Sequence, residues 1–436
     1  MSFWRIYADH KDPAYDLVFL RPPVFSPGSE DSLITACSWL KECDGSHKKC
    51  LEWRQKFVPL RLLDLGEESA PAQIRLTTPD QKADVSYAAL SYCWGGDQPL
   101  KTTCATILQM EKGISMERLP QTIRDAVQVT HKIGLRFLWI DSFCIVQDDE
   151  YELAEQTAHM HQIFRSAYVT IAATAARSCT DGFLIHERRL QSSIDWNLCQ
   201  VTAHCKNGTV GAVVVGENEA SKDGSEPQHF SEPLSQRGWT LQETMLSSRI
   251  LSYSSTQLRW YCPTRAAVDG GYTDTSGPLY GLDPGMSYFR PRPLIRWFCG
   301  RWDSLRYPFD WLDLVDQYRY RKLSYPSDAL PAISAIAQRY GSLQRCGAYL
   351  AGVWERNFFL QLLWMEVHTF HSLPQYPYRA PSWSWASSNP DAAIWWPLLQ
   401  DVHSRNYSKV SVSCQLLHFD TTLQSPQAPY GKVTAG

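Results

Sequence analysis

The sequence has no excess of basic residues, because 42 Lys and Arg are balanced by 45 Asp and Glu in 436 residues. Such a chain has no broad positive field to attract nucleic acid or an anionic membrane surface. No apolar run approaches the roughly 18 residues that a spanning helix needs, and the first residues lack the pattern of a secretory signal. We therefore expect a cytoplasmic protein that binds no nucleic acid and has no membrane span.

The sequence also lacks internal repeats, low-complexity tracts, the glycine-rich phosphate loop and the dinucleotide fingerprint. Its length and 44% hydrophobic content instead predict two or three globular domains with a sizeable core. The 13 cysteines are spread along the chain, which is more typical of reduced cytosolic thiols than of a disulfide framework. Many of the 17 tryptophans lie in the last third, where we expect them to pack in a core.

One short stretch has the chemistry of metal ligands. Cys43, His47 and Cys50 lie close together, and Cys37 precedes them. Two thiols and an imidazole at this distance could hold zinc, with Cys37 as the fourth ligand. The spacing fits no standard zinc finger and a second ligand pair is missing, so we assign no metal and expect a turn with reduced cysteines.

The middle of the chain alternates strand and helix patterns. Apolar runs predict buried strands at 87–93, 137–141 and 168–174, and helical spacing predicts helices at 120–133 and 150–167. Short connections between alternating strands and helices are typical of a parallel sheet covered by helices. We therefore predict an α/β core with a parallel sheet and helices on both faces.

The remaining patterns divide the chain into three parts. Residues 1–84 form an N-terminal extension with a hairpin at 58–76, residues 85–262 form the α/β domain, and residues 263–436 form a mixed α+β, aromatic-rich region. A variable insertion at about 188–233 contains an expected strand at 208–216 and an expected exposed loop at 217–232. A strand pair is expected at 250–262, and helical patches at 311–320, 328–339 and 354–364.

Polar and aromatic residues follow the predicted strands. Asp141 is the last residue of the strand at 137–141, and Trp94 follows the strand at 87–93. Gly95 and the next glycine would let the backbone bend sharply or approach a ligand. In open α/β sheets the ligand crevice lies at the carboxyl ends of the strands, so we expect these residues near a site.

Five motifs occur in a fixed order over roughly residues 85–245. They are Leu90–Gly95 (LSYCWG), Leu119–Ile123 (LPQTI), Leu138–Asp149 (LWIDSFCIVQDD), Gln156 with Met160, and Arg237–Glu243 (RGWTLQE). In this combination the chain resembles the fungal heterokaryon incompatibility (HET) domain family. Val146 and Gly238 stand where family members often have other residues, but neither departure removes a carboxylate. The segments 325–332 and 379–388 resemble the C-terminal half of long fungal HET proteins.

The resemblance implies an intracellular fungal protein linked to non-self recognition and programmed cell death. It also implies a distant kinship with TIR domains, some of which cleave NAD, and therefore a TIR-like or flavodoxin-like core. No cofactor is required under this reading, and NAD is a substrate. Protein partners are expected, either a second copy of the chain or an incompatibility partner.

The analogy with NAD cleavage suggests roles for individual residues. The reaction passes through an oxocarbenium-like state that a carboxylate can stabilise or capture, so Glu243 and Asp141 are the candidate catalytic residues. Tyr92, Trp94, Gly95, Arg237 and Trp239 are the candidate NAD-binding residues. Either tryptophan could stack on a ring of NAD, and the planar guanidinium of Arg237 suits a phosphate.

Structural roles are the alternative for the same residues. Asp141 could cap a turn, Arg237 and Glu243 could form an internal ion pair, and Trp94 and Trp239 could fill the core. The domain would then act without catalysis, as a signalling module that self-associates or binds a partner. The aromatic C-terminal region could restrain it.

Other catalytic sites fit less well. Cys93 or Cys144 could act as a nucleophile with His131, His159 or His161, but buried thiols are commonly inert. Ser91 lacks the flanking glycines of a nucleophile elbow. His159 and His161 are two positions apart on a predicted helix, so they cannot share one metal.

Overall fold

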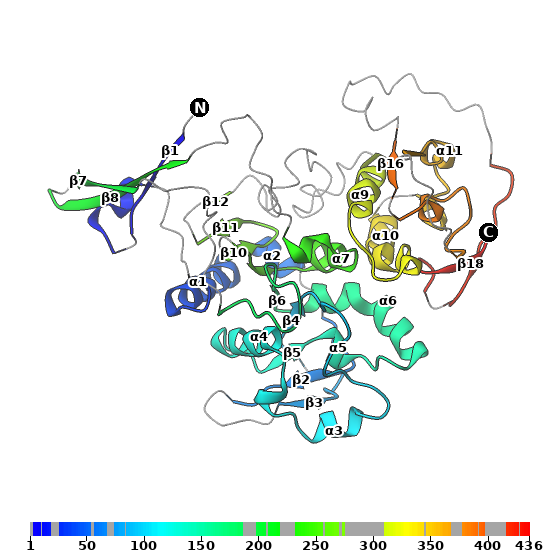
Figure 1. Ribbon diagram of the computed structural model, residues 1–436, viewed down its shortest axis with the longest axis horizontal. Helices are drawn as coiled ribbons and strands as arrows, with labels where there is room; N and C mark the ends of the chain where they lie inside the picture. The colour runs from blue at the N-terminus through cyan, green and yellow to red at the C-terminus, as the bar shows by residue number, and fades with distance from the viewer. Residues whose placement is uncertain are drawn as a thin grey trace.

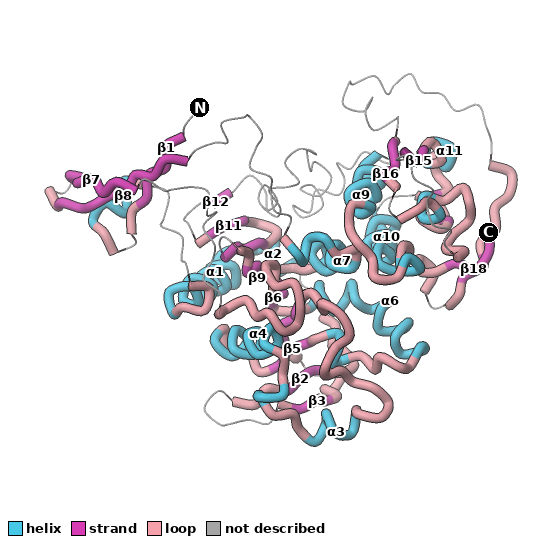
Figure 2. The backbone as a smooth tube through the Cα atoms, viewed as in Figure 1, coloured by secondary structure: helices cyan, strands magenta, loops and turns pink. Residues whose placement is uncertain are grey.

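The chain is organised around a nine-stranded mixed sheet (Figures 1 and 2). The computed structural model describes residues 3–9, 11–18, 26–53, 56–67, 74–82, 84–185, 198–205, 208–218, 232–255, 258–269, 273–274, 309–343, 346–367, 377–390, 392–396, 416–426 and 428–436. In sheet order the strands are β12 (Thr273–Asp274), β11 (Ala266–Val268), β10 (Leu258–Tyr261), β9 (Ile250–Tyr253), β6 (Val169–Ala172), β4 (Tyr87–Ser91), β5 (Phe137–Trp139), β2 (Leu62–Asp64) and β3 (Arg75–Thr77).

The four central strands run parallel. β4 pairs in parallel with β5 and with β6, and β6 pairs in parallel with β9. Both flanks are antiparallel, because β2 pairs with β5 and β3 on one side and β10 pairs with β9 and β11 on the other. The prediction of a parallel sheet is therefore correct only for the centre, since the two predicted hairpins join its edges and make the whole sheet mixed.

Helices cover both faces of this sheet, as predicted. α4 (Gln121–Lys132) connects β4 to β5, α6 (Glu150–Ser166) connects β5 to β6, and α7 (Trp239–Leu246) precedes β9. In the sheet, β5 lies on one side of β4 and β6 lies on the other. The connection from β4 to β5 therefore runs along the sheet in one direction, and the connection from β5 to β6 runs in the opposite direction. Because parallel crossovers are right-handed, α4 lies on one face and α6 with α7 lies on the other (Figure 1). α1 (Glu30–Ser46) lies beside α4.

The local sequence explains where these helices begin and what they bury. Pro120 precedes α4, where its missing N–H is harmless. Asp149 caps α6 by accepting hydrogen bonds from the amides of Tyr151 and Glu152. Along α6, residues spaced by three or four positions form one buried stripe: Gln156, Met160, Ile163 and Phe164.

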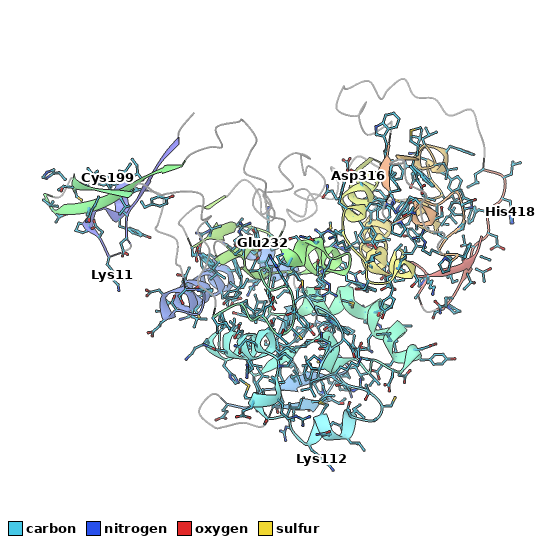
Figure 3. All side chains as sticks on the ribbon, viewed as in Figure 1. Lys11, Lys112, Cys199, Glu232, Asp316 and His418 are labelled. Atoms are coloured by element: carbon cyan, nitrogen blue, oxygen red, sulfur yellow. The ribbon has the colours of Figure 1, made fainter. Side chains whose placement is uncertain are left out.

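A separate three-stranded sheet joins two strands of the predicted insertion to the N-terminal segment. β1 (Phe3–Tyr7) pairs with β8 (Val210–Asn218), which pairs with β7 (Leu198–His204). In Figure 3, Cys199 is labelled on β7 and Lys11 is labelled in the turn after β1. The carboxylate of Asp12 accepts a hydrogen bond from the amide of Ala212 at 3.0 Å. The N-terminal extension and the insertion therefore share one structural unit.

The loop predicted at 217–232 needs correction at both ends. Residues 217 and 218 belong to β8, which is longer than expected because its pairing with β1 extends it. Glu232 is buried, and its Oε1 accepts hydrogen bonds from the amide and hydroxyl of Ser255 at 3.0 and 2.8 Å. Residues 219–231 lie outside the described part of the chain.

The C-terminal region is built from short elements around buried tryptophans. The helices and strands of this region are α9 (Phe309–Arg319), α10 (Pro331–Leu343), β13 (Tyr349–Leu350), β14 (Val353–Trp354), α11 (Phe358–Gln361), β15 (Met365–Val367), β16 (Ala393–Trp395), β17 (Thr422–Leu423) and β18 (Val433–Ala435). The indoles of Trp311 and Trp385 both donate to the carbonyl of Gly352, at 3.0 and 2.8 Å. This confirms the predicted aromatic core packing.

The helix predicted at 354–364 is mostly wrong. Only Phe358–Gln361 is helical, and Trp354 belongs to β14. Ala351 and Gly352 have φ values of 43° and 99°, which turn the chain into a tight hairpin that local helical spacing cannot reveal. The C-terminal region shares one continuous hydrophobic core with the main sheet and its helices, and α10 packs against α6 and α7. No helix in the described ranges is long and apolar enough to cross a bilayer.

Candidate functional site

The candidate site lies at the carboxyl edge of the central parallel strands. β4 ends at Ser91 and continues into Trp94, while β5 ends just before Asp141, the first residue of the short helix α5 (Asp141–Cys144). α7 brings Glu243 to the same edge, where its side chain meets Ser91. The carboxyl ends of parallel strands meet on one side of a sheet, so residues distant in sequence gather there. We call Asp141, Arg237 and Glu243 the carboxylate site.

Glu243 is the more deeply buried carboxylate, with 7% of its surface exposed. Its Oε2 accepts a hydrogen bond from the Ser91 hydroxyl at 2.5 Å. Burial raises the pKa of Glu243 to about 7 and the charge of Asp141 adds to the rise, whereas Ser91 and Arg237 oppose it. A carboxyl group with a pKa near 7 can both release and accept a proton at neutral pH.

Asp141 is only partly buried and lies at the rim of the site. Its Oδ2 accepts a hydrogen bond from the Trp94 indole at 2.9 Å, and its Oδ1 accepts one from the amide of Ser142 at 2.6 Å. Burial raises the pKa of Asp141, although the charge of Arg237 and the bond from Trp94 lower it. Oδ1 thus bonds to the amide of the next residue within α5 rather than capping a turn, and Oδ2 bonds to the indole of Trp94.

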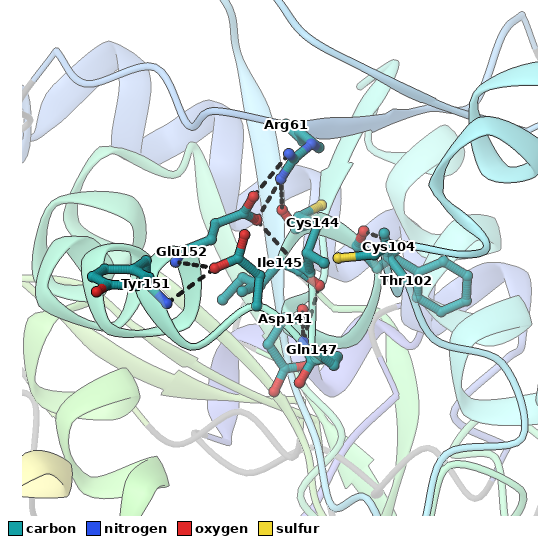
Figure 4. Close-up of polar contacts among 12 residues, drawn as sticks. Arg61, Thr102, Cys104, Asp141, Cys144, Ile145, Gln147, Tyr151 and Glu152 are labelled. Atoms are coloured by element: carbon teal, nitrogen blue, oxygen red, sulfur yellow. Dashed lines mark hydrogen bonds and ion pairs between the residues drawn. The ribbon is translucent and has the colours of Figure 1, made fainter.

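The segment that carries Asp141 is fixed on both sides (Figure 4). The Gln147 amide donates to the carbonyl of Asp141 at 3.0 Å, and the backbone of Thr102 pairs with Ser142 and Gln147. Arg61 forms two hydrogen bonds with Glu152, at 2.5 and 2.9 Å, and their side chains are 13% and 14% exposed. Partly buried bidentate pairs of this kind hold geometry well. Glu152 Oε1 also accepts a hydrogen bond from the amide of Val146 at 2.9 Å, so the segment that follows Asp141 has a defined position.

Arg237 is the cation of the site. Its Nη1 donates to the carbonyl of Tyr92 at 2.5 Å, and its charge lowers the pKa of both Asp141 and Glu243. The internal ion pair considered for Arg237 and Glu243 is not formed among the described residues, because the guanidinium bonds to a backbone carbonyl instead. Arg237 therefore stabilises both carboxylates through its field while staying partly exposed.

Two of the candidate NAD-binding residues have internal partners. The Tyr92 side chain is buried, and its hydroxyl lies 2.8 Å from the Ser142 hydroxyl and 3.1 Å from Gln98 Oε1. Gly95 has a φ of 75°, and a Cβ there would lie 2.2 Å from the Cβ of Ser178. Both residues thus have packing reasons for their identity, and their contact with NAD stays a prediction.

The two candidate tryptophans have different neighbours. Trp94 donates to Asp141 within the site, whereas the Trp239 indole donates to Asp328 Oδ2 at 3.1 Å. Asp328 lies just before α10 in the C-terminal region. Trp239 therefore joins two regions, while Trp94 alone lies beside a carboxylate of the site.

Sequence reasoning missed the residues that hold the loop after β6 against the edge. On α4, Asp125 Oδ2 accepts hydrogen bonds from the amides of Phe183 and Leu184, at 2.6 and 2.9 Å. Thr122 accepts from the amide of Gly182 at 3.0 Å and donates to the carbonyl of Ser178 at 2.9 Å. Both side chains are buried, and a polar residue within the apolar face of a helix is the signal that could have revealed them.

A cysteine nucleophile is not supported. Burial raises the pKa of Cys93 to about 11 and that of Cys144 to about 12, so both stay protonated at neutral pH. His159 stacks on Phe57, and His161 Nδ1 contacts the carbonyl of Ala158. Within the described ranges no histidine bonds to either thiol.

One comparison with known proteins gives a match. Residues 87–243 match the family model described as "Heterokaryon incompatibility protein (HET)". This range starts at the first residue of β4 and ends at Glu243, so it contains the whole carboxylate site. The chain matches no curated protein and no solved structure.

Proposed function

Because residues 87–243 belong to the heterokaryon incompatibility (HET) family, we propose that this chain acts in fungal non-self recognition that ends in programmed cell death. We further propose that its output is hydrolysis of NAD in the cytoplasm, at the carboxylate site. The observation that carries this proposal is the convergence of Asp141, Glu243 and Arg237 at one sheet edge, where the charge of Arg237 lowers the pKa of both carboxyl groups and the charge of Asp141 raises that of Glu243.

The strand order supports the kinship with TIR domains. In chain order the parallel strands β4, β5, β6 and β9 are numbers one to four, and they lie side by side as 2-1-3-4. This is the order at the start of a flavodoxin-like sheet, whose ligands bind at the carboxyl edge where the order reverses, between strands one and three. Here that point lies between β4 and β6, next to Ser91 and Trp94.

The geometry favours a division of labour between the carboxylates. The bond between the nicotinamide nitrogen and the ribose C1′ breaks, and its electron pair goes to the ring nitrogen, so nicotinamide leaves neutral without needing a proton. Asp141, at the rim, stabilises the positive charge that develops at C1′. Water then bonds to C1′ and gives its proton to Glu243, whose pKa of about 7 suits a general base. The products are nicotinamide, ADP-ribose and one proton.

Neighbouring residues have supporting roles in this proposal. Trp94 offers a ring face beside Asp141 for the nicotinamide, and Arg237 offers the guanidinium for a phosphate. The bond from Trp94 keeps the Asp141 carboxylate oriented.

Expression of the full chain in yeast, with cellular NAD measured, tests the proposal. We expect toxicity with loss of NAD for the native chain, and normal NAD with Glu243→Gln or Asp141→Asn at equal protein levels. Asp97→Asn is the matched control, because its exposed carboxylate lies in the turn after Trp94 outside the site. Toxicity with unchanged NAD, or toxicity that survives both substitutions in folded protein, would rule out the hydrolase.

The burial of Glu243 favours a second candidate function. A carboxyl group that is 7% exposed and bonded to Ser91 is also what a structural role requires. The domain would then act by self-association or partner binding without catalysis. Toxicity with unchanged NAD, together with a concentration-dependent oligomer in light scattering, is the outcome that this candidate predicts.

A further inference from the structure

Four buried side chains converge at the opposite edge of the same sheet. Cys43, His47, Cys50 and Cys262 are each buried, and their ligand atoms all lie within 4.8 Å of one another. We call these four residues the thiol site. Cys37, the fourth ligand considered from the sequence, is not among them, because its thiol donates to the carbonyl of Lys132 on α4. The cysteines of this turn are free thiols, and a cysteine distant in sequence, Cys262, lies beside them.

The fold explains how these residues meet. Cys43 and His47 are four positions apart at the end of α1, and Cys50 follows in α2 (Lys48–Trp53). Cys262 comes directly after β10, in a tight turn where its backbone N–H and C=O both bond to Arg265. Since β10 runs antiparallel to β9 and Tyr261 pairs with Ile250, Cys262 lies at the amino edge of the parallel strands.

The distances suit one tetrahedral ion. The Cys262 sulfur lies 3.4 Å from His47 Nδ1. A tetrahedral zinc ion with the usual Zn–S and Zn–N distances separates sulfur from nitrogen by about 3.5 Å, and sulfur from sulfur by about 3.8 Å. The first separation is close to that of Cys262 and His47, and both are below the 4.8 Å within which all four ligand atoms lie.

The charges next to the cluster favour an anionic centre. Arg249 has a fully buried side chain and lies next to this cluster. Its Nη2 donates to Asp44 at 2.6 Å, but its Nε and Nη1 are buried and donate no hydrogen bond. Zinc with three thiolates and a neutral imidazole has a net charge of −1, which compensates a buried guanidinium. With three neutral thiols the partly exposed Asp44 carboxylate would be the anion paired with this guanidinium, and its buried Nε and Nη1 would have no anion beside them.

We infer that Cys43, His47, Cys50 and Cys262 bind one zinc ion in a closed structural site. Four protein ligands leave no open position for substrate or activated water, which separates this site from catalytic zinc centres. Borderline-soft sulfur and imidazole ligands in a tetrahedral set select zinc over hard cations such as magnesium or calcium.

The ion would attach the segment α1–α2 to the end of β10. Its ligands lie outside residues 87–243 on both sides, so the ion would close a loop that contains the whole HET match. Residues 43–50 and 262 would then be part of the folded HET unit. Around the ion, Arg265 pairs with Glu42 and Thr264 contacts Cys50, which ties the same two segments together.

Metal analysis of the purified full chain tests the inference. We expect about one zinc per chain by mass spectrometry of the elements, and a loss of at least tenfold in Cys50→Ser and Cys262→Ser. Cys37→Ser is the matched control and should keep its zinc. Less than a tenth of an equivalent in folded native chain, or equal loss in Cys37→Ser, would overturn the site.

A second measurement covers variants that do not fold. Metal-stripped native chain titrated with Co²⁺ should develop the intense visible absorption of tetrahedral thiolate cobalt, saturate at one equivalent and lose it to Zn²⁺. Weak absorption typical of octahedral cobalt would contradict the inference. So would a disulfide among Cys43, Cys50 and Cys262, detected by mass spectrometry after alkylation without reductant.

Discussion

The two edges of the central sheet differ in how their polar groups are satisfied. At the carboxyl edge, Asp141 and Glu243 have raised pKa values. Arg237 donates its hydrogen bond to a backbone carbonyl rather than to either carboxylate. At the amino edge, four ligands face one another around one point. Carboxyl groups with perturbed pKa values are typical of catalytic sites, whereas a complete set of metal ligands is typical of a site that stabilises the fold. Under the two proposals, the same sheet has a reactive site at one edge and a structural site at the other.

Removal of zinc gives the largest expected effect and tests the structural half of this comparison. A strong chelator should lower the unfolding temperature of the native chain by roughly 10 °C, because a lost metal removes several kcal/mol from a folded domain. Re-addition of Zn²⁺ should restore it. Differential scanning fluorimetry provides the measurement, with Cys37→Ser responding like the native chain. An unfolding temperature indifferent to chelation in zinc-containing protein would show that the ion does not support the fold.

The pH dependence of stability tests the reactive half. Glu243 has a folded-state pKa of about 7 against an ordinary value of 4.5, so the folded protein binds more protons between these values. Stability must then fall as pH rises from 4.5 to 7 and stay reduced above it. Glu243→Gln should remove this loss, and so stabilise the chain at pH 8 by up to about 3 kcal/mol while changing little at pH 4.5.

Urea unfolding at the two pH values measures this difference, with Asp97→Asn as the exposed control. A Glu243→Gln variant that is less stable than the native chain at pH 8 would contradict the claim that ionised Glu243 destabilises the fold. It would instead make Glu243 a structural residue.

Gly95 sharpens the comparison by separating packing from ligand binding. Gly95→Ala should cost about 2 kcal/mol of stability, because its positive φ is strained for alanine and its Cβ would collide with Ser178. The neighbouring Gly96 also has a positive φ, but a Cβ there meets nothing within 4 Å, so Gly96→Ala should cost less. Chemical denaturation measures both. If the two variants are equally stable, packing does not explain why residue 95 is a glycine, and contact with a ligand remains as the explanation.

The contact between Trp239 and Asp328 gives the smallest expected effect. Asp328→Ala removes the acceptor of a partly buried hydrogen bond and should cost about 1 kcal/mol, whereas Asp328→Asn keeps an acceptor. If the C-terminal region restrains the HET domain, Asp328→Ala should also raise toxicity in yeast at unchanged protein level. If both variants are as toxic as the native chain, the contact between Trp239 and Asp328 does not restrain the HET domain.

Local sequence patterns were sufficient for much of the carboxyl edge. Asp141 and Trp94 could be placed because each follows a short apolar run, and strands of a parallel centre end on the same side. Glu243 and Arg237 entered through the family motif, and α7 brings them to that edge. The pattern did not reveal that Trp239 points toward Asp328, because the partner lies in another region of the chain.

The amino edge could not be predicted to the same degree. Cys43, His47 and Cys50 are visible as a group in the sequence, but Cys262 becomes their neighbour only through the pairing of β10 with β9. Cys37 was the nearer cysteine and the wrong one, since it points toward α4. Likewise, the hairpin at Ala351 and Gly352 depends on positive φ values and buried tryptophans rather than on helical spacing.

The most direct test of the central claim is nicotinamide release from NAD by the purified full chain, followed by chromatography from pH 5 to pH 9. Because Glu243 must be deprotonated to accept the proton of water, we expect release to rise with pH and level off above about pH 7, and to fall by ~10²-fold or more in Glu243→Gln. No release from folded native chain, or equal release from the native chain and Glu243→Gln at every pH, would contradict the account.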